Sequence, residues 1–427
     1  MKIVNQPQEK EWASLMQRPE ADFRDIEAAV REIIQDVRRN GNEALLRYNA
    51  ALDGYRGKNL RVEADEFEKA EIALSPDLKS AILLAAKNIE KFHQTLLPKS
   101  QKTEVQEGIV CWKKALPIDD VGLYIPGGTA PLFSTVLMLG IPARLAGCKN
   151  VFLCTPPSSD GKVHPAIIFA AKVAGITNVF LCGGAQAIAA MAFGNTQVPK
   201  ADKIFGPGNR YVTMAKSLVA SYGIAIDMPA GPSEVLVIAD ESANANFVAS
   251  DLLSQAEHGV DSQVICLCLS ENKAQAIAGA VEELLAKLPR KEIAEKALQK
   301  SAVIVLQSME EAMRFSNQYA PEHLILACDD AEQWAEQVRH AGSVFLGHYS
   351  PESAGDYASG TNHTLPTNGF AKAYSGVSTE SFMKNISFQQ LSQKGLTDLS
   401  QTVIQMAEAE GLHAHALAVK VRMNDEI

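Results

Sequence analysis

The stretch Val121-Gly-Leu-Tyr-Ile-Pro-Gly-Gly128 decides the fold, because a short apolar run ends there in a glycine-rich turn that precedes a helix. From Asp119 onward the same succession repeats along the chain. In this first series we expect strands at 121–125, 151–155, 178–182, 203–205 and 225–228, and helices near 132–147, 162–174, 185–193 and 209–221. This alternation predicts a parallel sheet covered by helices on both faces.

A second series of strands and helices follows without a linker. Its expected strands are 234–239, 263–269, 303–306, 324–327 and 343–346, with helices near 245–257, 272–286, 309–318 and 330–340. Two similar α/β sheets side by side are typical of a duplicated nucleotide-binding architecture, with a ligand crevice between them. The fold class predicted from these patterns is therefore α/β with two Rossmann-like sheets.

The two ends of the chain are expected to be helical. Residues 1–115 show apolar positions at helical spacing, and one helix is expected from about 75 to 92. The tail after about 381 is polar, helical and too small to fold unaided. Its few apolar positions need a further surface for their burial: Leu412, Ala416 and Val419.

Composition restricts the class and the partners. A chain of 427 residues suggests roughly two or three domains. Its net charge of −10, from 40 basic and 50 acidic side chains, comes with no basic run, so we expect no nucleic acid partner and favour a cationic small molecule. Because the amino-terminal residues lack a signal-peptide core and the apolar runs are too short to span a bilayer, we expect a cytoplasmic protein without a membrane partner.

Three glycine-rich turns lie between a strand and a helix, at 124–128, 182–186 and 205–209. Open α/β sheets bind phosphates and nucleotides at such turns. None matches G-x-G-x-x-G, and the chain has no G-x-x-x-x-G-K-[ST], so the usual NAD and ATP fingerprints are missing. Any one turn can be purely conformational, but three together favour a nucleotide-like ligand.

A pair of polar side chains stands near the end of an expected apolar helix, in Leu252-Leu-Ser-Gln-Ala-Glu-His-Gly-Val-Asp261. Gln255 and His258 are one turn apart, at i and i+3, where two side chains can converge on one point. That point can be a metal ion. The alternative is a helix end with a solvated Gln and a His that satisfies the last carbonyl groups.

Adjacent ionisable residues mark a second candidate site, in Ala320-Pro-Glu-His-Leu324. Glu322 and His323 stand at the start of an expected strand, directly after a proline, and are candidate general bases. The alternative is a surface turn. A third, weaker candidate is Ser233, whose hydroxyl follows the rigid segment Ile226-Asp-Met-Pro-Ala-Gly-Pro232 and could face the crevice between the sheets.

Residues 348–380 are rich in Gly, Ser, Thr and Asn and too long for an idle connection, so we expect a functional loop. Within them, Glu352, Asp356 and His363 add two carboxylates and an imidazole. With His413 or His415 from the tail, a Gln/His/Asp/His ligand set becomes available. Nitrogen and oxygen ligands without a thiolate suit Zn²⁺ or a similar divalent ion.

Taken together, several of these strings resemble the histidinol dehydrogenase family, in order and over nearly the whole chain. They are Ile204-Phe-Gly-Pro-Gly-Asn209, Ile226-Asp-Met-Pro-Ala-Gly-Pro-Ser-Glu234, Ser250-Asp-Leu-Leu-Ser-Gln-Ala-Glu-His258, Pro321-Glu-His323, Ala354-Gly-Asp-Tyr-Ala-Ser-Gly-Thr-Asn-His363 and the tail pattern Leu412-x-Ala-His415. The resemblance implies oxidation of L-histidinol through L-histidinal to L-histidine with reduction of two NAD⁺, the last steps of histidine biosynthesis.

The resemblance also assigns roles to single residues. It implies Zn²⁺ held by Gln255, His258, Asp356 and His415, and an acid–base pair of Glu322 and His323. The resemblance further implies that substrate is contacted by the four zinc ligands, His323, Ser233 and Glu410. It implies NAD contacts by Tyr124, Gln186 and Asn209. Because residues two apart do not share a helix face, only one of the two tail histidines can ligate, and the family pattern selects His415.

The same resemblance implies an aldehyde-dehydrogenase-like arrangement of the two sheets and a homodimer with shared active sites. The expected parts are a helical arm at 1–21, a discontinuous α/β domain at 22–123 plus 235–380 on the substrate and metal side, a second α/β domain at 124–234 on the NAD side, and a dimer-crossing tail at 381–427.

Two other enzyme classes and one class of protein without enzymatic activity are the alternatives. A metal-independent NAD aldehyde dehydrogenase needs a reactive cysteine, but Cys148 and Cys154 lack the positive neighbours that lower a thiol pKa. The seven cysteines, odd in number and without C-x-x-C, are expected to be reduced. A zinc hydrolase would use Glu322 to activate water, and a metal-binding scaffold would turn over no alcohol.

Overall fold

The computed structural model describes residues 1–19, 24–127, 130–158, 160–228 and 231–423. The chain forms two units, of which the first is Met1–Leu96 with Ile118–Phe382 and the second is Leu97–Pro117 with Met383–Ile427. No helix among the described residues is long and apolar enough to cross a membrane.

A five-stranded parallel sheet is built from the first series of strands. Its order is β6-β5-β4-β7-β8, and the strands are β4 (Asp120–Tyr124), β5 (Asn150–Thr155), β6 (Asn178–Leu181), β7 (Lys203–Phe205) and β8 (Ala225–Ile226). The order reverses between β4 and β7, so the carboxyl ends of these two strands flank a switch point. In open α/β sheets, ligands bind at such a point.

Seven helices accompany this sheet within the first unit. They are α2 (Arg24–Leu52), α3 (Ala64–Ala73), α4 (Pro76–Gln94), α5 (Phe133–Ala146), α6 (Pro165–Ala174), α7 (Gly184–Phe193) and α8 (Arg210–Ala220). Alternate strand residues such as Phe152 and Ile204 pack against apolar side chains of α2, α7 and α8 in one core. The contacts of α3 and α4 are with α6 and α5. Helices between residues 24 and 94 therefore pack against the helices of the five-stranded sheet.

A six-stranded parallel sheet is built from the second series together with the amino terminus. Its order is β1-β11-β10-β9-β12-β13, and the strands are β1 (Lys2–Asn5), β9 (Glu234–Ala239), β10 (Gln263–Cys268), β11 (Ala302–Val305), β12 (His323–Ala327) and β13 (Ser343–Leu346). Both predicted series of strands are thus confirmed. β1 pairs in parallel with β11 at the edge of the sheet, where only a helical arm was expected; its four residues are mostly exposed, so no apolar period marks them as a strand.

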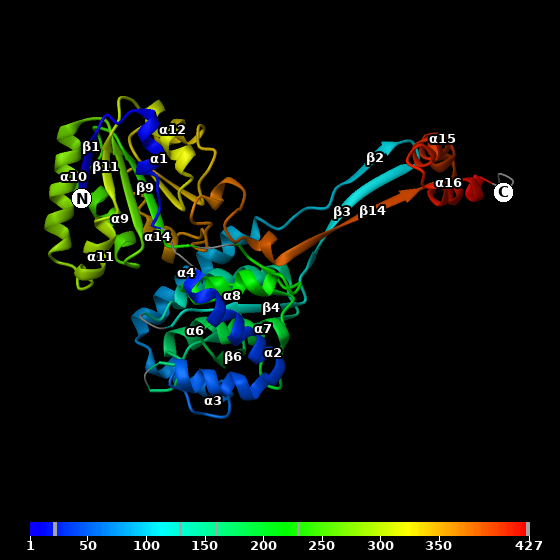
Figure 1. Ribbon diagram of the computed structural model, residues 1–427, viewed down its shortest axis with the longest axis horizontal. Helices are drawn as coiled ribbons and strands as arrows, with labels where there is room; N and C mark the ends of the chain where they lie inside the picture. The colour runs from blue at the N-terminus through cyan, green and yellow to red at the C-terminus, as the bar shows by residue number, and fades with distance from the viewer. Residues whose placement is uncertain (20–23, 128–129, 159, 229–230, 424–427) are drawn as a thin grey trace. The chain divides into compact units, whose positions relative to one another are not determined.

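Strand residues of the six-stranded sheet alternate between two cores, as a period of two requires. Val235 and Val237 face α9 (Ala245–Ala256), α10 (Glu271–Leu285) and α11 (Lys291–Leu298), whereas Leu236 and Ile238 share a core with α1 (Glu9–Leu15), α12 (Met309–Tyr319) and α13 (Ala331–Ala335). Figure 1 shows α9, α10 and α11 beside this sheet. After β13 the chain forms α14 (Glu352–Tyr357), η1 (Phe370–Lys372) and η2 (Thr379–Phe382).

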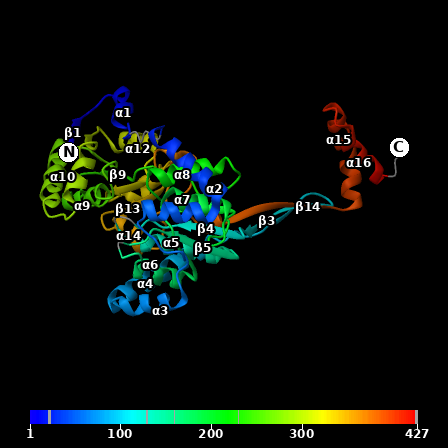
Figure 2. The ribbon, with the colours of Figure 1, turned by 60° about the horizontal axis from the view of Figure 1, so that its bottom comes forward.

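The second unit corrects the expectation of helix at both ends. β14 (Met383–Leu391), β3 (Ile109–Pro117) and β2 (Lys102–Gln106) form an antiparallel sheet, and Figure 2 shows β14 beside β3. These strands were missed because most of their residues are exposed, so no apolar period of two marks them. α15 (Gln393–Ala409), α16 (His413–Lys420) and η3 (Val421–Met423) follow.

A small core within the second unit corrects a further expectation. Ala416 and Val419 are buried against Ile404 and Ala407 of α15, whereas Leu412 is 45% exposed. Two of the three apolar tail positions therefore find a partner inside the unit.

Candidate functional site

The amino ends of β9 and β12 carry the polar cluster that the sequence singled out. Glu234 is the first residue of β9 and His323 the first of β12, and the two strands pair in parallel, so both residues lie at one edge of the sheet. Gln255 reaches the same edge because α9 returns from the carboxyl end of β9. The cluster thus lies opposite the carboxyl edge, where open α/β sheets usually bind ligands.

His323 is buried and has polar neighbours on both sides of its ring. Its Nδ1 lies 3.1 Å from the carbonyl oxygen of Glu234 and 3.3 Å from Nε2 of Gln255, while Nε2 lies 3.5 Å from Oδ1 of Asp356. Burial alone would lower the pKa of His323. The carboxylates of Glu352, Glu322 and Asp356 outweigh it and raise that pKa well above its ordinary value.

Glu322 is a buried carboxylate next to this imidazole. Its Oε2 accepts a hydrogen bond of 2.8 Å from the backbone N–H of Glu234 and lies 3.7 Å from Nδ1 of His323. Burial raises the pKa of Glu322 to about 8, although His323 opposes the shift. This carboxylate therefore exchanges its proton near neutral pH, as a general base must.

Two further carboxylates come from α14, where Glu352 and Asp356 share one face at i and i+4. His323, Glu352 and Asp356 offer ligand atoms within 4.8 Å of one another, an arrangement that can hold a metal ion. Glu352 is 1% exposed, and burial raises its pKa. The sequence marked Glu352 as a loop carboxylate and gave it no role.

Buried oxygen atoms without partners also point into this cluster. Oε1 of Gln255 and Oδ1 of Asp356 make no hydrogen bond with any residue that the structure describes. An unpaired buried polar atom is costly, so such atoms commonly serve a ligand or an ion. Both residues belong to the ligand set expected for Zn²⁺.

His258 follows α9 in a turn, and its backbone N–H donates to the carbonyl of Gln255 over 3.2 Å. The residue as a whole is exposed, yet surrounding protein atoms lower the pKa of its imidazole, and the carboxylate of Asp356 opposes this. His258 therefore lies within electrostatic reach of Asp356.

His363 supports the end of α14, the helix that carries Asp356, a function that sequence reasoning did not assign. Its Nδ1 lies 2.8 Å from the carbonyl oxygen of Asp356, and its Nε2 lies 3.0 Å from Oγ1 of Thr135 on α5. The ring thus links the end of α14 to a helix of the five-stranded sheet. Only the position of His363 within the polar loop gave a signal for it.

Three further contact residues are expected: Ser233 is the sequence neighbour of Glu234, and Glu410 and His415 belong to the second unit. Ser233 is half-buried directly before β9, and its carbonyl accepts from the N–H of Gln263 over 3.2 Å. Glu410 ends α15 and His415 lies in α16, both exposed in the second unit.

The candidate nucleotide residues lie at the carboxyl ends of the five-stranded sheet. The hydroxyl of Tyr124 accepts from the N–H of Gly184 over 3.1 Å, and Oδ2 of Asp53 accepts from Nε2 of Gln186 and the N–H of Gly183, both over 3.0 Å. Asp53 follows α2 and carries no sequence signal. Oε1 of the buried Gln186 has no hydrogen-bond partner among the described residues.

The turn after β7 is fixed on both sides. Gly206 has φ +125°, and a Cβ there would collide with the carbonyl oxygen of Tyr124, so only glycine fits. The buried ion pair of Lys216 and Asp227 brackets this glycine: Nζ donates to its carbonyl and Oδ2 accepts from its N–H, both over 2.8 Å. Asn209 caps α8 by accepting from two backbone N–H groups, over 3.0 and 3.2 Å.

The cysteines offer no activated nucleophile. All seven are free, and burial raises the pKa of Cys148 to about 11 and that of Cys154 further. The thiols of Cys148 and Cys154 are therefore protonated at neutral pH, which agrees with the sequence argument against thiol catalysis.

Two parallel sheets with glycine-rich turns at a switch point, and a buried cluster of amide, carboxylate and imidazole groups, are features of an α/β enzyme. The chain belongs to the histidinol dehydrogenase family, whose family model matches residues 16–423. It is therefore an oxidoreductase of histidine biosynthesis.

Individual relatives match over nearly their whole length. The chain is 54% identical over 424 residues to a histidinol dehydrogenase of Bacteroides thetaiotaomicron, covering 99% of both chains. It is 52% identical over 396 residues to one of Xylella fastidiosa, covering 92% of both. The crystal structure of histidinol dehydrogenase from Elizabethkingia anophelis superimposes with a TM-score of 0.97 at 53% identity, covering 99% of this chain and 98% of that one.

Proposed function

We propose that the protein oxidises L-histidinol through L-histidinal to L-histidine, with Zn²⁺ as its metal and two NAD⁺ as hydride acceptors. The observation that carries the proposal is the pair of unpaired buried oxygens, Oε1 of Gln255 and Oδ1 of Asp356, beside Glu322 and His323. Full-length identity above 50% to proteins named histidinol dehydrogenase supports the substrate.

The donor set fits zinc. Gln255 and Asp356 supply unpaired oxygens, and His258 supplies an imidazole within electrostatic reach of Asp356. Oxygen and nitrogen donors without a thiolate suit Zn²⁺. His415 is the fourth proposed ligand. Bound zinc would supply a Lewis-acidic centre able to orient a substrate that carries an imidazole and an amine, and its charge would offset the carboxylates that otherwise keep His323 protonated.

His323 is the proposed base of the first oxidation. With Nδ1–H donated to the carbonyl of Glu234, the lone pair resides on Nε2, which has no hydrogen-bond partner among the residues described. Nε2 takes the proton of the alcohol as the carbinol carbon loses hydride, and an aldehyde remains.

Glu322 is the proposed base of the second oxidation. The aldehyde carbon carries a hydrogen but no hydroxyl group. Water must therefore add to this carbon before a second hydride can leave. Glu322 takes a proton from that water as the water oxygen bonds to the carbonyl carbon, and the carbonyl oxygen becomes the alkoxide of the hydrate. Loss of hydride from this carbon then gives the acid. A pKa raised to about 8 suits this role because base strength grows with pKa while an ionised fraction persists.

Tyr124, Gln186 and Asn209 are the proposed NAD contacts, and Ser233 and Glu410 the proposed additional substrate contacts. Glycine-rich turns follow β4 and β7 at the switch point, where open α/β sheets bind phosphates, and the unpaired Oε1 of Gln186 lies in the first turn of α7, after β6. When bound, NAD⁺ accepts the hydride that each oxidation releases.

We further propose a homodimer in which the tail of one subunit completes the partner's site. The motive is the exposure of Glu410 and His415, together with exposed apolar residues of the second unit such as Met406 (62%) and Leu417 (43%).

The test is a spectrophotometric assay. Zinc-loaded protein should form NADH from L-histidinol and NAD⁺, a chelator should abolish the reaction, and Zn²⁺ should restore it. Absence of NADH formation by fully zinc-loaded protein would refute the proposal.

A further inference from the structure

We propose that Arg18 and Glu234 form a positioning pair that holds both Glu322 and His323 in their working geometry. This inference rests on the proposed function, since it assumes that these two residues carry the acid–base chemistry. Neither Arg18 nor Glu234 is among the residues expected to touch substrate, metal or NAD. They act through their neighbours.

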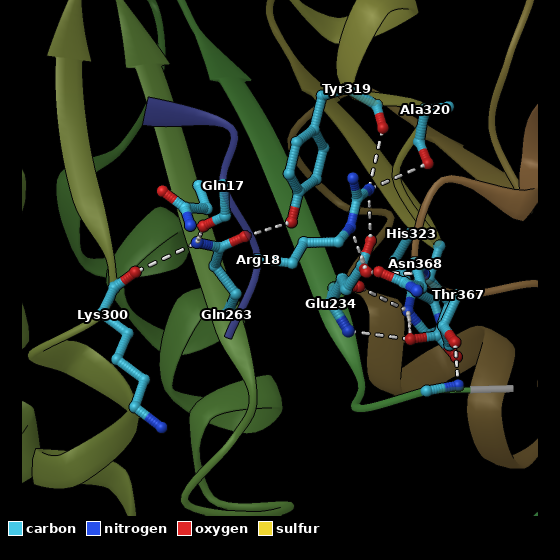
Figure 3. A network of polar contacts seen from close by, with 12 residues as sticks. Gln17, Arg18, Glu234, Gln263, Lys300, Tyr319, Ala320, His323, Thr367 and Asn368 are labelled. Carbon is cyan, nitrogen blue, oxygen red and sulfur yellow. Dashed lines mark hydrogen bonds and ion pairs between the residues drawn. The ribbon is translucent and has the colours of Figure 1, made fainter. Parts of the chain in front are cut away.

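The first step is the contact between the two charged groups. Nε of Arg18 donates to Oε1 of Glu234 over 2.6 Å and Nη2 donates to Oε2 over 2.9 Å, a bidentate ion pair (Figure 3). The side chains are 17% and 3% exposed. Such a pair fixes direction as well as distance, because the planar guanidinium matches the plane of the carboxylate.

The second step joins Glu234 to the catalytic pair. Its backbone N–H donates to Oε2 of Glu322 over 2.8 Å, and its carbonyl oxygen lies 3.1 Å from Nδ1 of His323 and 3.2 Å from Nε2 of Gln255. One residue thus offers its carboxylate to Arg18 and its two backbone groups to Glu322 and His323. A displacement of Glu234 would move both catalytic contacts together.

The third step concerns the turn that leads into β12. Nη2 of Arg18 also donates to the carbonyl oxygens of Tyr319 and Ala320, over 2.8 and 3.4 Å, and the guanidinium lies 3.9 Å from the centre of the Tyr319 ring. Ala320 has φ +55°, a left-handed conformation that is uncommon outside glycine, asparagine and aspartate. Arg18 therefore holds the turn from which Glu322 and His323 emerge as well as the start of β9.

The fourth step shows that the pair is itself held. Oε1 of Glu234 accepts from the N–H of Asn368 over 2.7 Å. Nε2 of Gln263 donates to the carbonyl of Gln17 over 3.0 Å, and the hydroxyl of Tyr319 donates to Oε1 of Gln263 over 2.8 Å (Figure 3). Gln263 therefore links the backbone of Gln17, next to Arg18, to Tyr319, whose ring lies against the guanidinium of Arg18.

The kinetic test uses Arg18→Met in the zinc-loaded full-length protein. We expect kcat for histidinol and kcat for histidinal to fall by a similar factor of about 10 to 100, because small misplacements of catalytic groups cost rates of this order. The KM for histidinol should stay within about threefold, since no binding group is removed. Arg18→Lys, which keeps the charge and loses the bidentate contact, should recover part of the loss.

Controls separate positioning from a general loss of fold. Rates are normalised to zinc-loaded sites. Arg47→Met, which removes the same group from an exposed pair with Asp36, should leave kcat unchanged. The double variant Arg18→Met/Glu234→Gln leaves no buried carboxylate of this pair without a partner. Its kcat should be close to that of Arg18→Met. If Arg18→Met does not fold, the double variant replaces it in the test.

Crystal structures of wild type and Arg18→Met, or of the double variant if that replaces it, give a readout independent of turnover. We expect the contacts from Glu234 to Glu322 and His323 to lengthen beyond hydrogen-bonding distance. Unchanged contacts, or a kcat within about twofold of wild type, would overturn the inference. A wild-type protein that does not oxidise histidinol would refute the proposed function instead, and the crystal structures would still decide the positioning of the two side chains.

Discussion

The backbone N–H of Glu234 donates to Oε2 of Glu322 over 2.8 Å, across 88 positions of the sequence. This bond fixes one carboxylate oxygen of Glu322 and leaves the other free to take a proton. Because burial raises the pKa of the group to about 8, the free oxygen is a stronger base than an exposed glutamate. The geometry thus suits activation of a single water molecule.

Replacing Glu322 with Gln should impair the second oxidation selectively. The amide can still accept from the N–H of Glu234 but can take no proton from water, so we expect the rate from histidinal to fall by about 10²–10⁴. Single-turnover rates from histidinol and from histidinal are compared, with the exposed Glu241→Gln as control. Equal losses of less than about tenfold from both substrates would exclude the assigned base.

Replacing His258 with Asn should lower zinc content and turnover together. The variant loses one of few protein ligands, and we expect metal affinity to fall by more than about tenfold. Metal analysis after dialysis against a competing chelator measures it, and His413→Asn serves as a control because only His415 of the tail histidines is assigned as a ligand. A His258→Asn protein with full zinc and full activity would show that the ligand set is wrong.

The sequence was sufficient for most parallel strands from β4 to β13 because these are buried apolar runs between turn residues, whereas β1, whose residues are mostly exposed, was missed. β7, β9 and β13 have the predicted bounds. β14 was missed because its residues are largely exposed, and its partner β3 lies more than 260 positions earlier. Local pattern carries no information on such pairings.

Some residues of the candidate site could likewise be predicted from the sequence, and others could not. Gln255, Glu322, His323 and Asp356 could be named because ionisable or amide groups at element ends are visible in the sequence, and the structure brings them together. Arg18 could not be named, since its partner Glu234 is 216 positions away and neither residue has a local signal. Asp53 was missed for the same reason.

Buried His93 should make stability depend on pH. Its ring nitrogens have no partner in the described part of the chain, and burial lowers its pKa from 6.5 to about 4. Between these values the unfolded chain binds more protons, so the free energy of unfolding falls as pH falls from about 6.5 to 4, by on the order of 2 to 3 kcal/mol for this group.

Denaturant unfolding of wild type and His93→Leu at pH 7.5 and pH 4.5 tests this expectation. The wild type should lose more stability between the two pH values than the variant, because leucine has no proton to bind. Equal losses would mean that His93 binds its proton equally well in the folded and the unfolded chain, and the assigned pKa shift would be wrong.

Two inactive chains should restore activity when mixed, if His415 serves the partner's site. In a mixed dimer of His415→Ala and Glu322→Ala, one of the two sites receives both residues intact. Random exchange makes half of the dimers mixed, so recovered turnover is at most about a quarter of wild type. Chain exchange demonstrated by native mass spectrometry without recovered turnover would mean that the tail serves its own subunit.

The ratio of NADH formed to histidinol consumed tests the central claim most directly, because it counts the hydride transfers at one site. Zinc-loaded protein is given limiting L-histidinol and excess NAD⁺, and the reaction is followed to completion with product analysis. We predict two NADH for each histidinol, with L-histidine as the product and no free histidinal. One NADH for each histidinol, with histidinal released, would contradict a site in which His323 and Glu322 serve successive oxidations.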